Sequence, residues 1–103
     1  LLSPNYQVYT ADTATNALRL LKEHPVDLII EDVWLPDRNG MDLLSELRSH
    51  YDKNAKVIMM SGAGTVQSAQ DAMSLGAIAY LLKPFNIEEL LVLVHDTLEP
   101  HGA

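Results

Sequence analysis

The chain contains no cysteine, which excludes a disulfide scaffold, a thiolate metal site and a cysteine nucleophile. Basic residues are few: seven Lys and Arg stand against 14 Asp and Glu, giving a formal net charge of −7. Direct nucleic-acid binding is therefore disfavoured, because neutralising phosphates requires clustered lysine and arginine. No apolar run approaches the roughly 20 residues of a membrane-spanning helix, and no signal-like segment opens the sequence. These absences predict a cytoplasmic protein without membrane contact.

The remaining composition is that of a single globular domain. The chain has 103 residues, which is the size of one hydrophobic core. Hydrophobic residues make up 48% and charged residues 20%, so the chain is not a disordered tail. We assign residues 1–98 to this domain and residues 99–103 to a linker or tail.

Short apolar runs alternate with helical patterns along the chain. Val26–Ile30, Lys56–Met60 and Ala77–Leu82 predict strands that are covered on both faces, as in a parallel sheet. A weaker run, Tyr6–Tyr9, has the composition of a fourth strand. Amphipathic periodicity predicts helices over residues 13–23, 41–48, 65–75 and 87–98. This order predicts right-handed βαβ crossovers, with helices on both faces of a parallel sheet.

Helix-end signals support three of these boundaries. Thr13 is the expected N-cap of the first predicted helix. Asn86 followed by Glu89 predicts a variant capping box at the start of the last helix. Gly76 stands where a glycine terminates a helix.

An acid, a hydroxyl and a cation follow the three strong strands, at Asp32, Ser61 and Lys83. In open α/β sheets, ligands bind beyond the carboxyl ends of the strands, so these side chains are expected to converge. A carboxylate can attack phosphorus and form an aspartyl phosphate. The transferred group carries negative charge that a lysine and a hydroxyl donor can stabilise. Mg²⁺ held by carboxylate and phosphoryl oxygens is the expected cofactor.

These residues and their neighbours resemble the receiver domain of bacterial response regulators. The motifs are Asp32 with Leu35-Pro36-Asp37 and Gly40, then Ser61-Gly62, then Lys83-Pro84-Phe85. The likeness extends over residues 1 to about 98, and from Gly64 onwards it looks most like receivers that precede sigma-54-type activators. The resemblance implies a flavodoxin-like, doubly wound parallel sheet with strand order 2-1-3-4-5.

The resemblance also implies roles for individual residues. Asp32 would be the phospho-acceptor for a sensor histidine kinase, and Lys83 would pair with it. The backbone carbonyl of Trp34 would join Asp32 as a Mg²⁺ ligand. Ser61 and Tyr80 would be switch residues that respond to the phosphoryl group. The peptide bond between Lys83 and Pro84 would be cis.

On this interpretation the chain is a signalling domain and not an enzyme, beyond assisting its own phosphorylation and dephosphorylation. It would switch an output domain, transcriptional in type, that lies outside this chain, and it could form a homodimer. The alternative is a phosphorylation-independent pseudo-receiver that acts as an interaction module. A flavodoxin-like cofactor binder is disfavoured, because Gly62-Ala63-Gly64 is too short for a dinucleotide fingerprint.

The chain departs from the family pattern at its start. Leu1–Asn5 matches the end of the family's first helix, so the first strand, most of that helix and an acidic pair are missing. Either the sequence is a fragment, which we favour, or a second copy fills the gap, or residues 6–10 pair elsewhere. Without the acidic pair, Mg²⁺ binding is expected to be weak. Glu31 is a poor substitute, because successive strand residues point to opposite faces.

Overall fold

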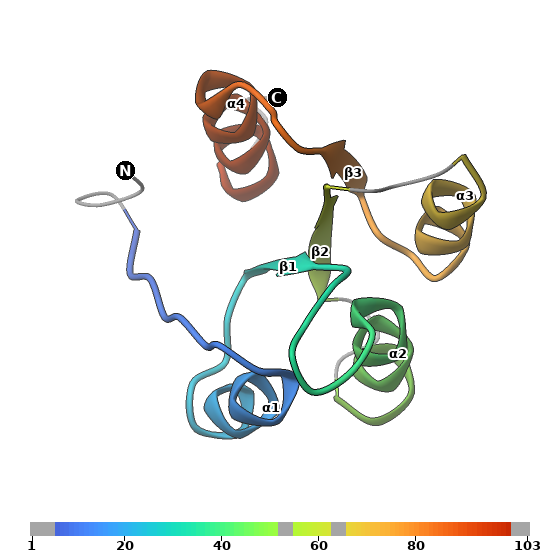
Figure 1. The fold of residues 1–103 in the computed structure, drawn as a ribbon. Helices are drawn as coiled ribbons and strands as arrows, with labels where there is room; N and C mark the ends of the chain where they lie inside the picture. Colours follow the sequence, from blue (N-terminus) through green and yellow to red (C-terminus); the bar gives the residue numbers. More distant parts are fainter. Residues whose placement is uncertain (1–5, 52–54, 63–65, 100–103) are drawn as a thin grey trace.

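The computed structural model describes residues 6–51, 55–62 and 66–99 (Figure 1). The predicted features at residues 1–5, at Ala63, Gly64 and Thr65, and at 100–103 lie outside these ranges. The elements in chain order are α1 (Ala14–Glu23), β1 (Leu28–Asp32), α2 (Gly40–Glu46), the π-helical turn η1 (Leu47–Tyr51), β2 (Lys56–Ser61), α3 (Val66–Ser74), β3 (Ala79–Leu82) and α4 (Ile87–Leu98).

The described strands form a parallel sheet in the order β1-β2-β3, which confirms the predicted α/β architecture. Asp32, the last residue of β1, is in register with Met60, and Ser61, the last residue of β2, is in register with Leu82. β2 therefore extends one position beyond β1, whereas β2 and β3 end level with each other. The three strand ends lie together along one edge of the sheet.

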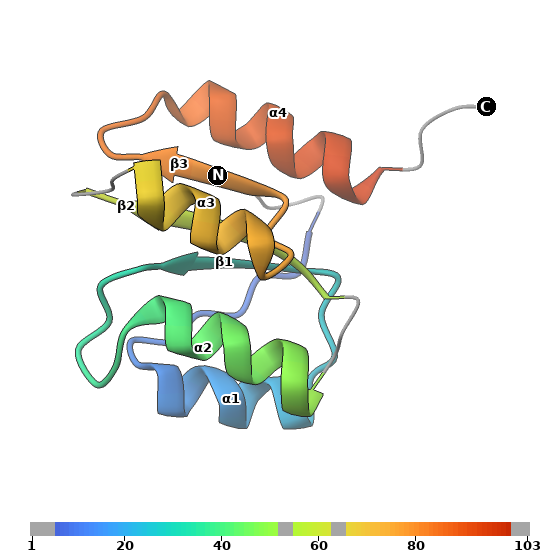
Figure 2. The same ribbon diagram turned by 90° about the vertical axis from the view of Figure 1, so that its right-hand side faces the viewer.

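Two apolar clusters lie on opposite sides of the sheet. Figure 2 shows α4 on one side, with α1 and α2 on the other. The larger cluster joins α1, α2 and α3 to the sheet through Ala14, Leu18, Val33, Leu43, Leu44, Leu47, Val57, Met59, Ala72 and Ala77. The smaller cluster joins α4 to the sheet through Ile58, Leu90 and Val94. Alternate residues of β1 contribute to the two clusters, as expected for a strand covered on both faces.

The predicted fourth strand at Tyr6–Tyr9 is wrong, because these residues form no ladder with the sheet. Side-chain contacts hold the segment instead. Tyr6 packs against the smaller cluster, and the ring of Tyr9 stacks on His24 with centroids 4.4 Å apart. A β-type composition needs a neighbouring strand edge within reach, and the described residues place none beside this segment.

Helix ends agree with the sequence except after α2 and in the capping arrangement of α4. Thr13 caps α1, and its side chain accepts a hydrogen bond from the Asn16 amide. Asn86 caps α4, but its side chain accepts from the amide of Glu88, so the reciprocal box with Glu89 is not the arrangement found. Gly76 adopts φ +90°, the left-handed conformation that a glycine tolerates at a helix end.

The helix predicted over 41–48 is instead α2 followed by the wider turn η1. Arg48 lies in this turn, and its guanidinium donates to the carbonyls of Leu75 at 2.9 Å, Ala55 at 2.6 Å and Gly76 at 2.8 Å. These contacts join the end of the α2 segment to the start of β2 and the end of α3. The carbonyl groups that Arg48 contacts lie outside its own helix, so helical periodicity could not predict these contacts.

Candidate functional site

Asp32 and Lys83 meet at the carboxyl edge of the sheet, as the sequence predicts. The Lys83 ammonium donates to Oδ2 of Asp32 at 2.5 Å, and the backbone amide of Trp34 donates to Oδ1 at 2.9 Å. Both carboxylate oxygens are therefore held in a fixed direction. The Lys83 and Asp32 side chains are 42% and 27% exposed, so the pair remains accessible from solvent.

Ser61 lies between the two in the order of the strands. Its carbonyl accepts a hydrogen bond from the Lys83 amide at 2.8 Å, which fixes the end of β3 against the end of β2. Ser61 is almost completely buried. The predicted cis peptide bond between Lys83 and Pro84 is present directly after this contact.

The Asp32 carboxylate is stabilised in its charged form. Burial by itself would raise the pKa of Asp32, but the hydrogen bonds from Lys83 and from the Trp34 amide outweigh burial and lower the pKa. An ionised carboxylate beside a lysine cation is suited to nucleophilic attack on an electrophilic phosphorus.

The loop after Asp32 is closed by backbone contacts. The Gly40 amide donates to the carbonyl of Val33 at 2.6 Å, and Trp34 and Asn39 form an antiparallel bridge. A Cβ atom at position 40 would lie 2.3 Å from the carbonyl oxygen of Asp32. The glycine of the motif is therefore needed for the close approach of α2 to the end of β1.

Trp34 and Tyr80, the two aromatic residues singled out in the sequence, lie in different surroundings. Trp34 is 64% exposed, and its backbone amide contacts Asp32. Tyr80 is half-buried on β3, and its hydroxyl shares a hydrogen bond of 2.8 Å with the Ser68 hydroxyl on α3. Tyr80 thus connects β3 to α3. None of the hydrogen bonds within the described ranges joins Tyr80 to Asp32 or Lys83.

Glu31 does not join Asp32, in agreement with the expected alternation along the strand. It is 6% exposed, and neither of its carboxyl oxygens has a hydrogen-bond partner. Burial raises the pKa of Glu31 to about 8, although the Arg48 guanidinium acts in the opposite direction. Glu31 is therefore not available as a ligand beside Asp32.

Asp37, part of the Leu35-Pro36-Asp37 motif, makes a contact with α1 that the sequence did not predict. Its carboxylate accepts hydrogen bonds from the backbone amides of Ala14 at 2.9 Å and Thr15 at 3.0 Å. These residues are 22 and 23 positions apart, so only the fold brings them together. One signal for this contact was available in the sequence. The first turn of α1 has no acidic residue of its own, so its positive end could attract an acidic residue from a loop.

Two oxygen donors at this edge are of the chemical type that Mg²⁺ binds. Asp32 offers a carboxylate and Trp34 a backbone carbonyl two residues later, and hard oxygen donors are what Mg²⁺ takes. Across the described ranges, however, no group of three or more His, Cys, Asp and Glu side chains forms a ready-made metal centre. Asp32 and the Trp34 carbonyl would therefore make up only part of a coordination shell.

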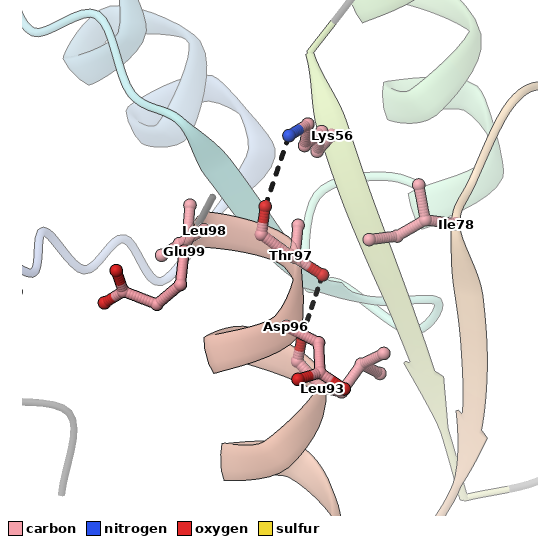
Figure 3. Close-up of a pocket in the computed structure, with 7 residues that line it drawn as sticks. All are labelled: Lys56, Ile78, Leu93, Asp96, Thr97, Leu98 and Glu99. Carbon is pink, nitrogen blue, oxygen red and sulfur yellow. Dashed lines mark hydrogen bonds between the residues drawn. The ribbon is translucent and has the colours of Figure 1, made fainter. Parts of the chain in front are cut away.

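A pocket of about 570 Å³ lies at the opposite edge of the sheet, where β2 begins and α4 ends (Figure 3). Its lining includes Lys56, whose ammonium donates to the backbone carbonyl of Thr97 at 3.2 Å. The acceptor residues contribute nothing to this pocket, so we assign it no part in their chemistry. None of the helices in the described ranges is long and apolar enough to cross a membrane.

Comparison with known proteins agrees with this geometry. The model of the response regulator receiver domain matches residues 1–95. The transcriptional regulatory protein KdpE of Mycobacterium tuberculosis is 42% identical over 98 residues, which are 95% of this chain and 42% of KdpE. The chain thus spans less than half the length of this relative.

Solved structures show the same likeness. The receiver domain of NtrX from Brucella abortus superposes with a TM-score of 0.83 at 28% identity, covering 93% of this chain and 81% of that one. CheY in a complex with CheX, BeF₃ and Mg²⁺ from Borrelia burgdorferi gives a TM-score of 0.76 at 29% identity, covering 85% of this chain and 66% of that one.

Proposed function

The chain belongs to the response regulator receiver domain family of two-component systems, and we propose that Asp32 is its phospho-acceptor. The observation that carries this proposal is the contact between Asp32 and Lys83 at the end of β1. A carboxylate that is ionised, accessible and paired with a cation is the arrangement that phosphoryl transfer requires.

In the proposed reaction, an Asp32 oxygen attacks the phosphorus of a phosphohistidine on a sensor kinase. A new oxygen–phosphorus bond forms while the phosphorus–nitrogen bond breaks, and the imidazole nitrogen keeps the electron pair and takes up a proton. Lys83 then moves its charge from the free carboxylate to a phosphoryl oxygen. The Ser61 hydroxyl donates to another phosphoryl oxygen.

Asp32 and the Trp34 carbonyl would hold Mg²⁺, which generally accompanies receiver domains and neutralises charge on the phosphoryl oxygens when bound. With only these two protein ligands, we propose that binding is weak. β1 has a strand neighbour on one side only in the described part of the chain. We propose that a further strand completes the sheet there and supplies an acidic pair.

Ser61 and Tyr80 are the proposed switch residues. The phosphoryl group would draw the Ser61 side chain towards it, and Tyr80 would change its contact with Ser68 on α3. Because α3, β3 and α4 follow one another around this edge, a small local change would alter a continuous surface. The proposed reader of that surface is an output domain, since the chain spans 42% of the transcriptional regulator KdpE. Self-association into a homodimer remains part of this proposal.

Incubation of the chain with a small phosphodonor and Mg²⁺ tests the acceptor assignment. We expect the intact mass to increase by one phosphoryl group, and we expect Asp32→Asn to abolish the increase. Asp27→Asn is the matched control, because it makes the same change to an exposed carboxylate just before β1. An equal increase in the Asp32→Asn variant would overturn the assignment.

Beryllofluoride separates a switching receiver from a phosphorylation-independent module. With Mg²⁺ present, we expect amide signals in α3 and α4 to shift in the unaltered chain and to stay in place in Asp32→Asn. Unchanged signals in both proteins, together with no uptake of a phosphoryl group, would support the phosphorylation-independent module instead.

A further inference from the structure

Asp37 links the loop after the acceptor to the start of a distant helix. Its Oδ1 accepts from the Ala14 amide at 2.9 Å, and its Oδ2 accepts from the Thr15 amide at 3.0 Å and the Thr15 hydroxyl at 2.9 Å. The amides of Ala14 and Thr15 and, less strongly, the Thr15 hydroxyl lower the pKa of Asp37 to about 2, so the carboxylate stays charged across the physiological range. The positive end of the α1 dipole favours the same charge.

The helix has an N-cap of its own, so these contacts do more than start α1. Thr13 already satisfies the Asn16 amide, which is the usual role of a capping side chain. Asp37 satisfies two further amides of the first turn that have no partner within the helix. The carboxylate therefore ties its own loop to a helix that is already capped.

The tie reaches the end of β1 because hydrogen bonds close the loop at its base. The bridge between Trp34 and Asn39 and the bond from the Gly40 amide to the Val33 carbonyl close the loop at its base. Asp37 lies inside this closed segment. A restraint on Asp37 is therefore transmitted to Trp34 through a few covalent bonds and a short ladder.

Trp34 completes the connection to the chemistry. Its amide donates to Oδ1 of Asp32 at 2.9 Å, and this bond, together with Lys83 on Oδ2, directs the carboxylate. We infer that Asp37 is a positioning residue for phosphoryl transfer: by tying the loop to the start of α1, it keeps the Trp34 backbone oriented toward Asp32. This inference rests on the proposed acceptor role of Asp32. Asp37 itself touches neither the acceptor nor the transferred group.

The test compares Asp37→Ala with Thr13→Ala in the 103-residue chain. Both variants remove side-chain hydrogen bonds from the start of α1, but only Asp37→Ala releases the loop. The readout is exchange of the Trp34 amide hydrogen with water, measured by NMR magnetisation transfer. We expect exchange to become about tenfold faster in Asp37→Ala and to stay within about twofold in Thr13→Ala, since one hydrogen bond is worth about a factor of ten.

A graded variant sharpens the result. Asp37→Asn keeps an oxygen for the Ala14 amide but offers an NH₂ group to the Thr15 donors, so we expect an intermediate exchange rate. The rate of Asp32 phosphorylation should fall in the same order, several-fold in Asp37→Ala and less in Asp37→Asn.

Equal Trp34 exchange in Asp37→Ala and Thr13→Ala would overturn the positioning role and leave Asp37 as a helix cap alone. Failure of the proposed function has a different signature. If the unaltered chain takes up no phosphoryl group, the acceptor assignment fails, while the Trp34 amide still decides whether Asp37 orients the loop.

Discussion

Glu31 and Asp32 are adjacent carboxylates at the end of one strand, yet the protein treats them in opposite ways. Asp32 faces the accessible edge, where Lys83 and the Trp34 amide hold both of its oxygens and lower its pKa. Glu31 faces the packed side of the sheet, where its oxygens have no hydrogen-bond partner and burial raises its pKa to about 8. The charge of a carboxylate on this strand is thus decided by the side to which it points.

Loss of Lys83 should have the largest effect, because it would leave the Asp32 carboxylate without its cation. We expect Lys83→Ala to raise the pKa of Asp32 and to slow its phosphorylation by a small phosphodonor about 100-fold, the usual effect of removing one charge-stabilising donor. Time-resolved mass spectrometry measures the rate. Lys56→Ala is the control, since Lys56 carries the same charge at the opposite edge of the sheet. Similar rates in the two variants would contradict the role given to Lys83.

Gly40→Ala tests how closely the acceptor edge depends on its backbone. The added Cβ would lie 2.3 Å from the Asp32 carbonyl oxygen, so we expect roughly 2–3 kcal/mol less unfolding free energy. Denaturant unfolding measures the change. Gly62→Ala is the matched control, because its Cβ would meet nothing closer than the Lys83 Cβ at 4.0 Å. An equal loss of unfolding free energy in the two variants would show that the backbone accommodates a Cβ atom at position 40 without a cost in stability.

Glu31→Leu, on the packed side of β1, should stabilise the folded protein. The folded protein holds a proton on Glu31 up to about pH 8, because burial raises the pKa of this carboxyl, whereas the unfolded chain releases the proton near the ordinary glutamate pKa of 4.5. The unaltered protein therefore loses stability as pH rises between these values. We expect Glu31→Leu to remove this loss and to add about 2 kcal/mol at pH 8, where the unpaired carboxylate is most costly.

Urea unfolding at about pH 5 and about pH 8 measures the difference between the two proteins. Glu23→Leu is the control, because it makes the same substitution at an exposed position of α1. A Glu31→Leu variant that keeps the full pH dependence would show that the decline in stability comes from another group.

Tyr80→Phe should have the smallest effect of the four. It removes the hydrogen bond between the Tyr80 and Ser68 hydroxyls, worth about 1 kcal/mol, and leaves the ring in place. Thermal unfolding checks the stability, with Tyr51→Phe at the more exposed Tyr51 as the control. If Tyr80 is a switch residue, beryllofluoride should also produce smaller shifts in α3. Shifts of unchanged size would separate Tyr80 from the switch.

Much of the fold and of the acceptor edge could be predicted from local patterns. The apolar runs located β1, β2 and β3. The polar residues that follow them predicted that Asp32, Ser61 and Lys83 lie at one edge of the sheet, while their chemical roles stay predictions. These predictions succeeded because strand burial and the convergence of parallel strand ends are general consequences of packing. The start of α1 succeeded for a similar reason, since an N-cap acts within one turn.

The predictions that failed depend on contacts between distant parts of the chain. Tyr6–Tyr9 has the composition of a strand, but pairing needs an edge beside it. The wide turn after α2 carries Arg48, whose carbonyl partners lie just after α3 and just before β2. The tie between Asp37 and α1 likewise joins a loop to a helix that precedes it by more than 20 residues. Periodicity reports on neighbours along the chain and contains no information about such contacts.

Trp34 is the single tryptophan of the chain, and it stands 64% exposed beside the acceptor carboxylate. Its indole emission therefore originates at one spot, the edge where a phosphoryl group and its counterion would arrive. Changes in intensity or quenching can be recorded in real time on unlabelled protein, with the four tyrosines left unexcited at long wavelength. The chain carries its own optical reporter, placed where the chemistry is proposed to occur.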